Sequence, residues 1–268
     1  MTPEEIIAAI DAGYDVEPVK KARDYIGASA VGHPCDAMLA LSLRGMPDDK
    51  AMPRLKRIFM MGHMLEDRVV RDLKEKADLR VWEVDGLTSR QFSYDAWGGH
   101  ISCHADGQVE VGDELMLLEV KSMNSASFAK FKAEGVKYSH PRYYAQVQMM
   151  MGMSGFQRTL FIAICKDNSE YHVEFIEADP IEGSFIEARV ERVLKGDVRR
   201  VASDPADWRC KDCFKRTACW GEEPLPLACQ TCTHATPTPD GGWHCTKLDK
   251  QAIEACDQWE RYRPKPRE

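Results

Sequence analysis

The sequence lacks three features that would indicate a membrane protein, a secreted protein or a general polyanion-binding protein. No uninterrupted apolar run reaches about 18 residues, the length of a transmembrane helix. The first residues, Met-Thr-Pro-Glu-Glu, lack the basic and apolar regions of a signal peptide. Basic residues are not in excess, because the formal net charge is −7. We therefore expect an intracellular, cytoplasmic protein without a membrane partner, whose contacts with any polyanion come from local basic clusters.

One candidate basic cluster lies between residues 189 and 216. Carboxylates are interspersed with it, so the alternative is a solvated helix face with balanced charge. The basic residues of this stretch are Arg189, Arg192, Lys195, Arg199, Arg200, Arg209, Lys211, Lys215 and Arg216.

The chain has 10 cysteines. In a reducing compartment they are expected to be metal ligands rather than disulfides. Cys210-x2-Cys213-x5-Cys219 supplies three thiolates, one fewer than a tetrahedral or cubane site needs. Beyond a proline-rich joint at residues 222–227, a second set has the spacing of a small zinc module that folds only with its metal. Its members are Cys229, Cys232, Cys245 and Cys256.

A second partition of the cysteines also has zinc-site spacing. It joins Cys210-x2-Cys213 to Cys229-x2-Cys232, as in a zinc ribbon, and leaves the remaining ligand candidates without an obvious site. We prefer the first partition because it uses eight cysteines in two complete sets. Cys103 and Cys165 lie in apolar strand patterns and are expected to be ordinary buried residues.

Two runs of alternating or clustered apolar residues, 101–111 and 114–122, predict a β-hairpin around Gly112-Asp113. If Val111 pairs with Glu114, then Asp106 faces Glu119 and His104 faces Lys121. Opposed carboxylates repel each other, so the pair predicts a divalent cation, Mg²⁺ or Mn²⁺. The alternative is that these charged residues lie on the solvent-exposed face of a surface hairpin. The apolar residues of both strands instead indicate that the hairpin packs on a hydrophobic core.

Helical periodicity marks the segments on either side of the hairpin. From Leu55 to Leu73 the apolar residues form one stripe, and Glu66 falls within it, where a carboxylate needs a partner or a ligand. Ser139 and Pro141 predict the cap and first turn of another helix, with Gln146 on one face. Residues 34–45 and 185–194 predict further helices, and 159–165 predicts a buried strand.

Four motifs now carry a resemblance that covers about residues 29–220. Asp106 with Glu119-Val120-Lys121 resembles the PD-(D/E)xK nuclease signature. Gly62 to Glu66 resembles the Gly-x-x-x-Glu helix motif of the lambda-exonuclease branch, and residues 143–146 resemble the start of the Gln-x-x-x-Tyr motif of RecB-like nucleases, although Met150 stands where tyrosine is expected. An N-terminal Cys35 with the triplet at 210–219 resembles the iron-sulfur clasp of CRISPR-associated RecB-like exonucleases.

The resemblance implies an α/β fold, a restriction-endonuclease-like core with a central mixed sheet flanked by helices, plus a small four-cysteine metal module. We expect a lead-in at 1–28, a nuclease domain with an iron-sulfur clasp at 29–222 and a zinc-binding module at 223–268. The implied activity is a divalent-metal-dependent DNA exonuclease that acts on single strands or duplex ends, in recombination, repair or CRISPR-type processing. A viral or mobile-element origin would suit it.

The resemblance also implies residue roles. Asp106, Glu119 and the Val120 carbonyl, with Glu66, would hold Mg²⁺ or Mn²⁺; Lys121 would orient the attacking water, and Gln146 would steady the DNA or the lysine. A 4Fe-4S cluster would be held by Cys35, Cys210, Cys213 and Cys219, and Zn²⁺ by Cys229, Cys232, Cys245 and Cys256. The alternative is a non-catalytic nucleic-acid-binding or assembly subunit, active only with a recombination or CRISPR-type protein partner that docks on the C-terminal module.

Overall fold

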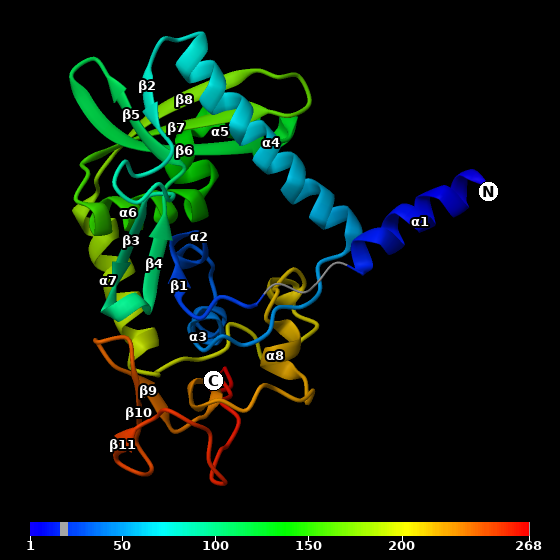
Figure 1. Ribbon diagram of the computed structural model, residues 1–268, viewed down its shortest axis with the longest axis vertical. Coiled ribbons are helices and arrows are strands. Elements are labelled where there is room, and N and C mark those ends of the chain that lie inside the picture. Colours follow the sequence, from blue (N-terminus) through cyan, green and yellow to red (C-terminus); the bar gives the residue numbers. More distant parts are fainter. Residues whose placement is uncertain (17–20, 268) are drawn as a thin grey trace.

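A five-stranded sheet forms the centre of the computed structural model, which describes residues 1–16 and 21–267 (Figure 1). Residues 17–20 of the expected lead-in, and Glu268, lie outside this description. The strand order is β2-β5-β6-β7-β8. β6 and β7 run parallel and their neighbours antiparallel, so the predicted mixed sheet is confirmed. The strands are β2 (Arg80–Trp82), β5 (Gly107–Val111), β6 (Glu114–Met123), β7 (Arg158–Cys165) and β8 (Tyr171–Glu177).

The central sheet is covered on both faces by apolar side chains. On one face, Leu117 and Phe161 pack against α5 (Ser125–Ser139) and α6 (Pro141–Ser154). On the other, Leu118 and Val120 pack against α4 (Pro53–Glu75). Burial on both faces explains why the middle of β6 reads as a continuous apolar run in which Glu119 is the exception.

The predicted hairpin turn and register are confirmed, since Val111 pairs with Glu114 and Gly107 with Leu118. The prediction of one continuous strand over residues 101–111 is wrong. The chain leaves β4 (Ile101–His104) after His104 and joins the central sheet only at Gly107, where a Cβ would lie 2.7 Å from the Trp82 carbonyl oxygen. β4 instead pairs with β1 (Ile26–Gly27) and β3 (Ser93–Ala96). His104 therefore faces Ser93, not Lys121.

The helices largely follow the predicted periodicity. α4 continues beyond the sheet toward α1 (Pro3–Asp15) (Figure 1), so that Ile58 and Phe59 in its first half are 39% and 47% exposed rather than buried. The residue that caps α6 is His140, not Ser139, because Ser139 ends the preceding helix. Other helices are α2 (Ala28–Val31), α3 (Asp36–Leu43), α7 (Pro180–Leu194) and α8 (Arg216–Trp220), with 3₁₀ turns η1 (Trp97–Gly99), η2 (Trp208–Cys210) and η3 (Cys229–Thr231).

The C-terminal residues form a separate small sheet at the end of the molecule opposite the five-stranded sheet (Figure 1). It consists of β9 (Ala235–Pro237), β10 (Trp243–Cys245) and β11 (Lys250–Gln251), all antiparallel. No helix of the described residues is long and apolar enough to cross a membrane.

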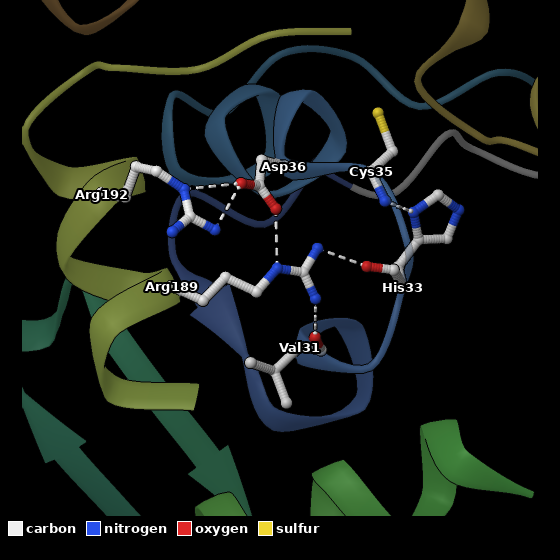
Figure 2. Close-up of polar contacts among 6 residues, drawn as sticks. All are labelled: Val31, His33, Cys35, Asp36, Arg189 and Arg192. Atoms are coloured by element: carbon white, nitrogen blue, oxygen red, sulfur yellow. Dashed lines mark hydrogen bonds and ion pairs between the residues drawn. The ribbon is translucent and has the colours of Figure 1, made fainter. Parts of the chain in front are cut away.

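Much of the basic stretch from 189 to 216 is used in internal contacts rather than presented as a cluster. Figure 2 shows the Arg189 guanidinium donating hydrogen bonds to Asp36 Oδ1 (2.7 Å) and to the carbonyls of Val31 and His33. Arg192 donates to the other oxygen of the same carboxylate, Asp36 Oδ2 (3.0 Å). Further residues of the stretch are likewise paired: Arg200 with the Cys219 carbonyl, Arg209 with Asp207 and Lys215 with Asp48. These contacts fix the segment before α3 against α7.

Candidate active site

The predicted site residues come together where α4, β6 and α6 meet the loop between β4 and β5. Glu119 on β6 has no exposed surface. Its Oε1 accepts hydrogen bonds from the Lys121 ammonium and from Gln146 Nε2, the latter at 2.7 Å. Lys121 therefore lies beside Glu119, and Gln146 reaches the same carboxylate oxygen from α6.

Asp106 stands in the loop beyond the last β5–β6 pair, not directly opposite Glu119 as the single-strand prediction placed it. Its Oδ2 accepts a hydrogen bond from the Val120 amide at 2.8 Å, which still holds it beside β6. Glu66 projects from α4, with its side chain 32% exposed, and His63 approaches it at 3.7 Å. The side chain of His63 itself is 82% exposed.

Burial, with a smaller effect of neighbouring carboxylates, raises the pKa values of Glu119 and Glu66. Burial raises the pKa of Glu119 to about 8, although the Lys121 charge opposes this. Burial and the Asp106 charge raise the pKa of Glu66 to about 7. Burial lowers the pKa of Lys121, but the charges of Glu119 and Asp106 outweigh that effect and raise it above its ordinary value. A cation placed among the carboxylates would favour their ionised forms.

The donor set fits a divalent cation with oxygen ligands. Glu119 Oε2 is buried and has no hydrogen-bond partner among the described residues. A buried, unpaired carboxylate oxygen is costly, and coordination of a cation would satisfy it. As the side chains stand, no group of three or more His, Cys, Asp or Glu within 1–16 and 21–267 is placed to hold an ion. The Lys121 ammonium and the Val120 amide each bind one carboxylate oxygen, Glu119 Oε1 and Asp106 Oδ2, which leaves Glu119 Oε2 as the unpaired oxygen for an ion.

One residue beside the site, Tyr143, was not predicted as a site residue. Met150, at the position expected for tyrosine, is fully buried in the core. Tyr143, three residues before Gln146 on the same helix, instead lies beside Lys121, whose Nζ is 5.4 Å from the ring centroid. The ring stacks on His140 at 5.4 Å and 9°. Helical spacing from Gln146 was the available signal, because residues three apart share a face.

The first cysteine set gathers around one cavity. Cys35, Cys210, Cys213 and Cys219 line it together with Arg200 and Arg209. Cys35 immediately precedes α3, and its amide donates to His33 Nδ1 at 3.1 Å (Figure 2). The Arg189–Asp36 contacts hold this segment, so the distant Cys35 reaches the C-terminal triplet. The structure thereby places Cys210 and Cys213 with Cys35 rather than with Cys229 and Cys232.

The second set gathers around another cavity in the C-terminal sheet. Cys229, Cys232, Cys245 and Cys256 line it, with His234. All 10 cysteines are free thiols. Cys103 and Cys165 are 1% and 0% exposed, which confirms the prediction that they are buried.

Comparisons with known proteins give similarity of fold only. The sequence matches no protein-family model and no curated protein. The chain is similar to an alkaline exonuclease from Laribacter hongkongensis, at 21% identity and TM-score 0.48, over 70% of this chain and 91% of that one. It is also similar to a phage-related exonuclease from Haemophilus somnus, at 12% identity and TM-score 0.46, over 68% of this chain and 95% of that one. At this level of similarity, function has to be argued from the residues of the site.

Proposed function

We propose that the protein is a divalent-metal-dependent DNA nuclease, an exonuclease of the PD-(D/E)xK superfamily acting on single strands or duplex ends. One observation carries the proposal. Glu119 is fully buried, and its Oε1 accepts hydrogen bonds from Lys121 and Gln146. Its Oε2 has no partner among the described residues. Asp106 and Glu66 lie beside it. A solvated surface hairpin gives no reason to bury a carboxylate in this way.

In this proposal Asp106, Glu119 and the Val120 carbonyl, with Glu66, hold Mg²⁺ or Mn²⁺. When bound, the cation supplies electrophilic activation of the scissile phosphate and a more acidic water. Lys121 donates a hydrogen bond to the attacking water and offsets the charge that develops on the phosphate. The water oxygen forms the new P–O bond as the bond to the leaving sugar oxygen breaks, and the water hydrogens end on the sugar hydroxyl and on the phosphate.

Gln146 and Tyr143 position Lys121 in this reaction. Gln146 Nε2 donates at 2.7 Å to the same Glu119 oxygen that accepts from Lys121, and so fixes the carboxylate beside the ammonium. The Tyr143 ring lies 5.4 Å from Lys121 Nζ, where a cation–π contact restrains the ammonium. Both side chains come from α6, so the helix sets the geometry of the lysine.

We further propose that the first cysteine set holds a 4Fe-4S cluster within a nuclease domain at 29–222, and that the second holds Zn²⁺ in a module at 223–268. Four thiols around one cavity match the ligand number of each group. Arg200, Arg209 and Arg216 also line the first cavity, and their charge suits a negatively charged thiolate cluster. Iron and sulfide content after anaerobic purification, compared between the wild type and Cys213→Ser, tests the first assignment.

The nuclease proposal is tested by incubating end-labelled single- and double-stranded DNA with Mg²⁺ or Mn²⁺. The wild type is expected to shorten the labelled strand, and Lys121→Ala and Asp106→Asn are expected to leave it intact while circular dichroism stays unchanged. Lys74→Ala, in a side chain paired with Glu83 on the surface, is the matched control and should cut like the wild type. Cleavage by Lys121→Ala at the wild-type rate would contradict the proposal.

A second candidate is a nucleic-acid-binding or assembly subunit that is active only with a recombination or CRISPR-type partner. The ion pairs of Arg189, Arg192 and Arg209 favour dependence on a partner, because these arginines contribute less to a DNA-binding surface of the chain itself and a partner would supply the missing contacts. Failure of the isolated wild type to cut any substrate, with cleavage restored by a partner and lost again in Lys121→Ala, would select this candidate.

A further inference from the structure

Arg44 joins the C-terminal module to the end of α3. Its guanidinium is buried, with 5% of the residue exposed. Nη1 donates to the carbonyls of Gln230 and Cys232, both at 2.9 Å, and Nη2 donates to the carbonyl of Ala235 at 2.8 Å. The Arg44 side chain thus hydrogen-bonds three carbonyls of residues 230–235, the segment that contains Cys232.

The remaining surroundings of Arg44 are aromatic. Its guanidinium carbon lies 3.7 Å from the ring centroid of Tyr262 and 5.2 Å from that of Trp243. Within 1–16 and 21–267 the partners of Arg44 are carbonyls, the two rings and the Tyr262 side-chain hydrogen bond, with no carboxylate ion pair. A buried cation without a countercharge is strongly destabilising, so a negative group is expected near Arg44.

The second cysteine set is the group that can supply this charge. The turn from Cys229 to Cys232 closes through the Cys232 amide and the Cys229 carbonyl at 2.9 Å, and the Glu260 amide donates to Cys232 Sγ at 3.5 Å. Amide donation to sulfur stabilises a thiolate. Zn²⁺ with four thiolates has a net formal charge of about −2. Cys232 would contribute one of these thiolates, and Arg44 binds the carbonyl of the same residue.

We propose that Arg44 is the countercation and clamp of a tetrathiolate zinc site formed by Cys229, Cys232, Cys245 and Cys256. This inference rests on the zinc assignment proposed above and is independent of nuclease activity. Zinc fixes the loop whose carbonyls face Arg44, and Arg44 in turn offsets the charge of the site and holds the loop in place. Outer-shell partners of this kind typically contribute 10–100-fold to metal affinity.

The clamp also links the two cysteine sets. α3 has Cys35 of the first set at its N-cap and Arg44 at its C-cap. A second contact runs through Arg261, whose Nη2 donates to the carbonyl of Ala218, the neighbour of Cys219, at 2.8 Å. Loading the C-terminal module with zinc therefore restrains α3 and α8, and residues of both helices line the other cavity.

The zinc site is tested by elemental analysis of the full chain purified from zinc-supplemented medium, and by the visible spectrum after Co²⁺ replacement. Cys245→Ser is expected to lose one Zn²⁺ per chain and the tetrathiolate Co²⁺ bands, whereas Cys103→Ser, a buried cysteine outside both sets, keeps them. His234→Gln is also expected to keep them. A wild type without zinc, or a loss of the ion in Cys213→Ser instead of Cys245→Ser, would overturn the assignment.

The role of Arg44 is tested by the rate of zinc release to a chromogenic chelator. Arg44→Met removes the charge and the three hydrogen bonds but keeps the aliphatic stem, and should release zinc at least about tenfold faster. Arg90→Met, an exposed arginine, is the control. Arg44→Lys restores the charge and should return the rate most of the way. Equal rates in Arg44→Met and the wild type, or in Arg44→Met and Arg44→Lys, would contradict the countercation role.

Discussion

The buried Glu119 predicts an unusual dependence of stability on pH in protein freed of Mg²⁺ and Mn²⁺. Its pKa is raised from 4.5 to about 8 in the folded protein, chiefly by burial. Between these values the folded state keeps a proton that the unfolded state releases. The free energy of unfolding contributed by this group therefore falls as pH rises from 4.5 to 8, by about 1.4 kcal/mol per pH unit and at most about 5 kcal/mol in all.

Glu119→Gln cannot ionise at this position and should remove this dependence of the free energy of unfolding on pH. The dependence on pH is the informative quantity rather than the absolute stability, because the substitution also removes the carboxylate that accepts from Lys121. Urea unfolding at pH 5.5, 7 and 8.5 measures the free energy of unfolding at each pH. Other titrating groups, such as His33 with its pKa lowered to about 4, chiefly by burial, are common to both proteins and largely cancel in the difference.

Glu114→Gln is the matched control, on the same strand but with a side chain 46% exposed, and should keep the wild-type slope. Mg²⁺ or Mn²⁺ at a hundredfold excess over its dissociation constant should stabilise the wild type by about 2.7 kcal/mol and flatten its slope, because the ion favours the charged carboxylate. If the free energies of unfolding of the wild type and Glu119→Gln change in parallel with pH without added ion, folded Glu119 does not retain a proton in this pH range.

Three further predictions concern Tyr143, Arg189 and Gly107. Tyr143→Ala should lower the cleavage rate by up to about 100-fold through misplacement of Lys121, while Tyr143→Phe, which keeps the ring, should cut nearly as the wild type does in a single-turnover assay. Arg189→Met should cost about 3 kcal/mol in urea unfolding because it leaves Asp36 and two carbonyls without this donor; Arg192→Met, in a side chain 47% exposed, should cost less than about 1 kcal/mol. Gly107→Ala should destabilise by about 1–3 kcal/mol, because its Cβ would lie 2.7 Å from the Trp82 carbonyl, whereas Gly152→Ala, with open space in α6, should stabilise by up to about 1 kcal/mol; thermal unfolding distinguishes the two.

Local patterns predicted most of what lies near the site. The Gly112-Asp113 turn fixes the register of β5 and β6, because a two-residue loop leaves one pairing for the strands that follow it. Helical periodicity likewise placed Glu66 on the face of α4 that reaches the sheet. These features depend on neighbours a few residues apart, so the sequence contains the information directly.

Features that depend on distant partners were not predictable in the same way. The break after His104 occurs because β4 pairs with β1 and β3, segments that short-range alternation does not connect to it. The internal use of Arg189 depends on Asp36, far away in sequence. Tyr143 was not predicted as a site residue because the motif places its tyrosine at position 150, whereas the fold brings the ring at position 143 to Lys121.

The most direct test of the central claim is a Mn²⁺ titration in which DNA cleavage and the free energy of unfolding are measured on the same protein. If the buried carboxylates hold the catalytic ion, both quantities rise with the same Mn²⁺ midpoint in the wild type, and both responses disappear in Glu119→Gln. Cleavage that persists in Glu119→Gln, or Mn²⁺ stabilisation of the wild type without cleavage of any DNA substrate, would contradict the account.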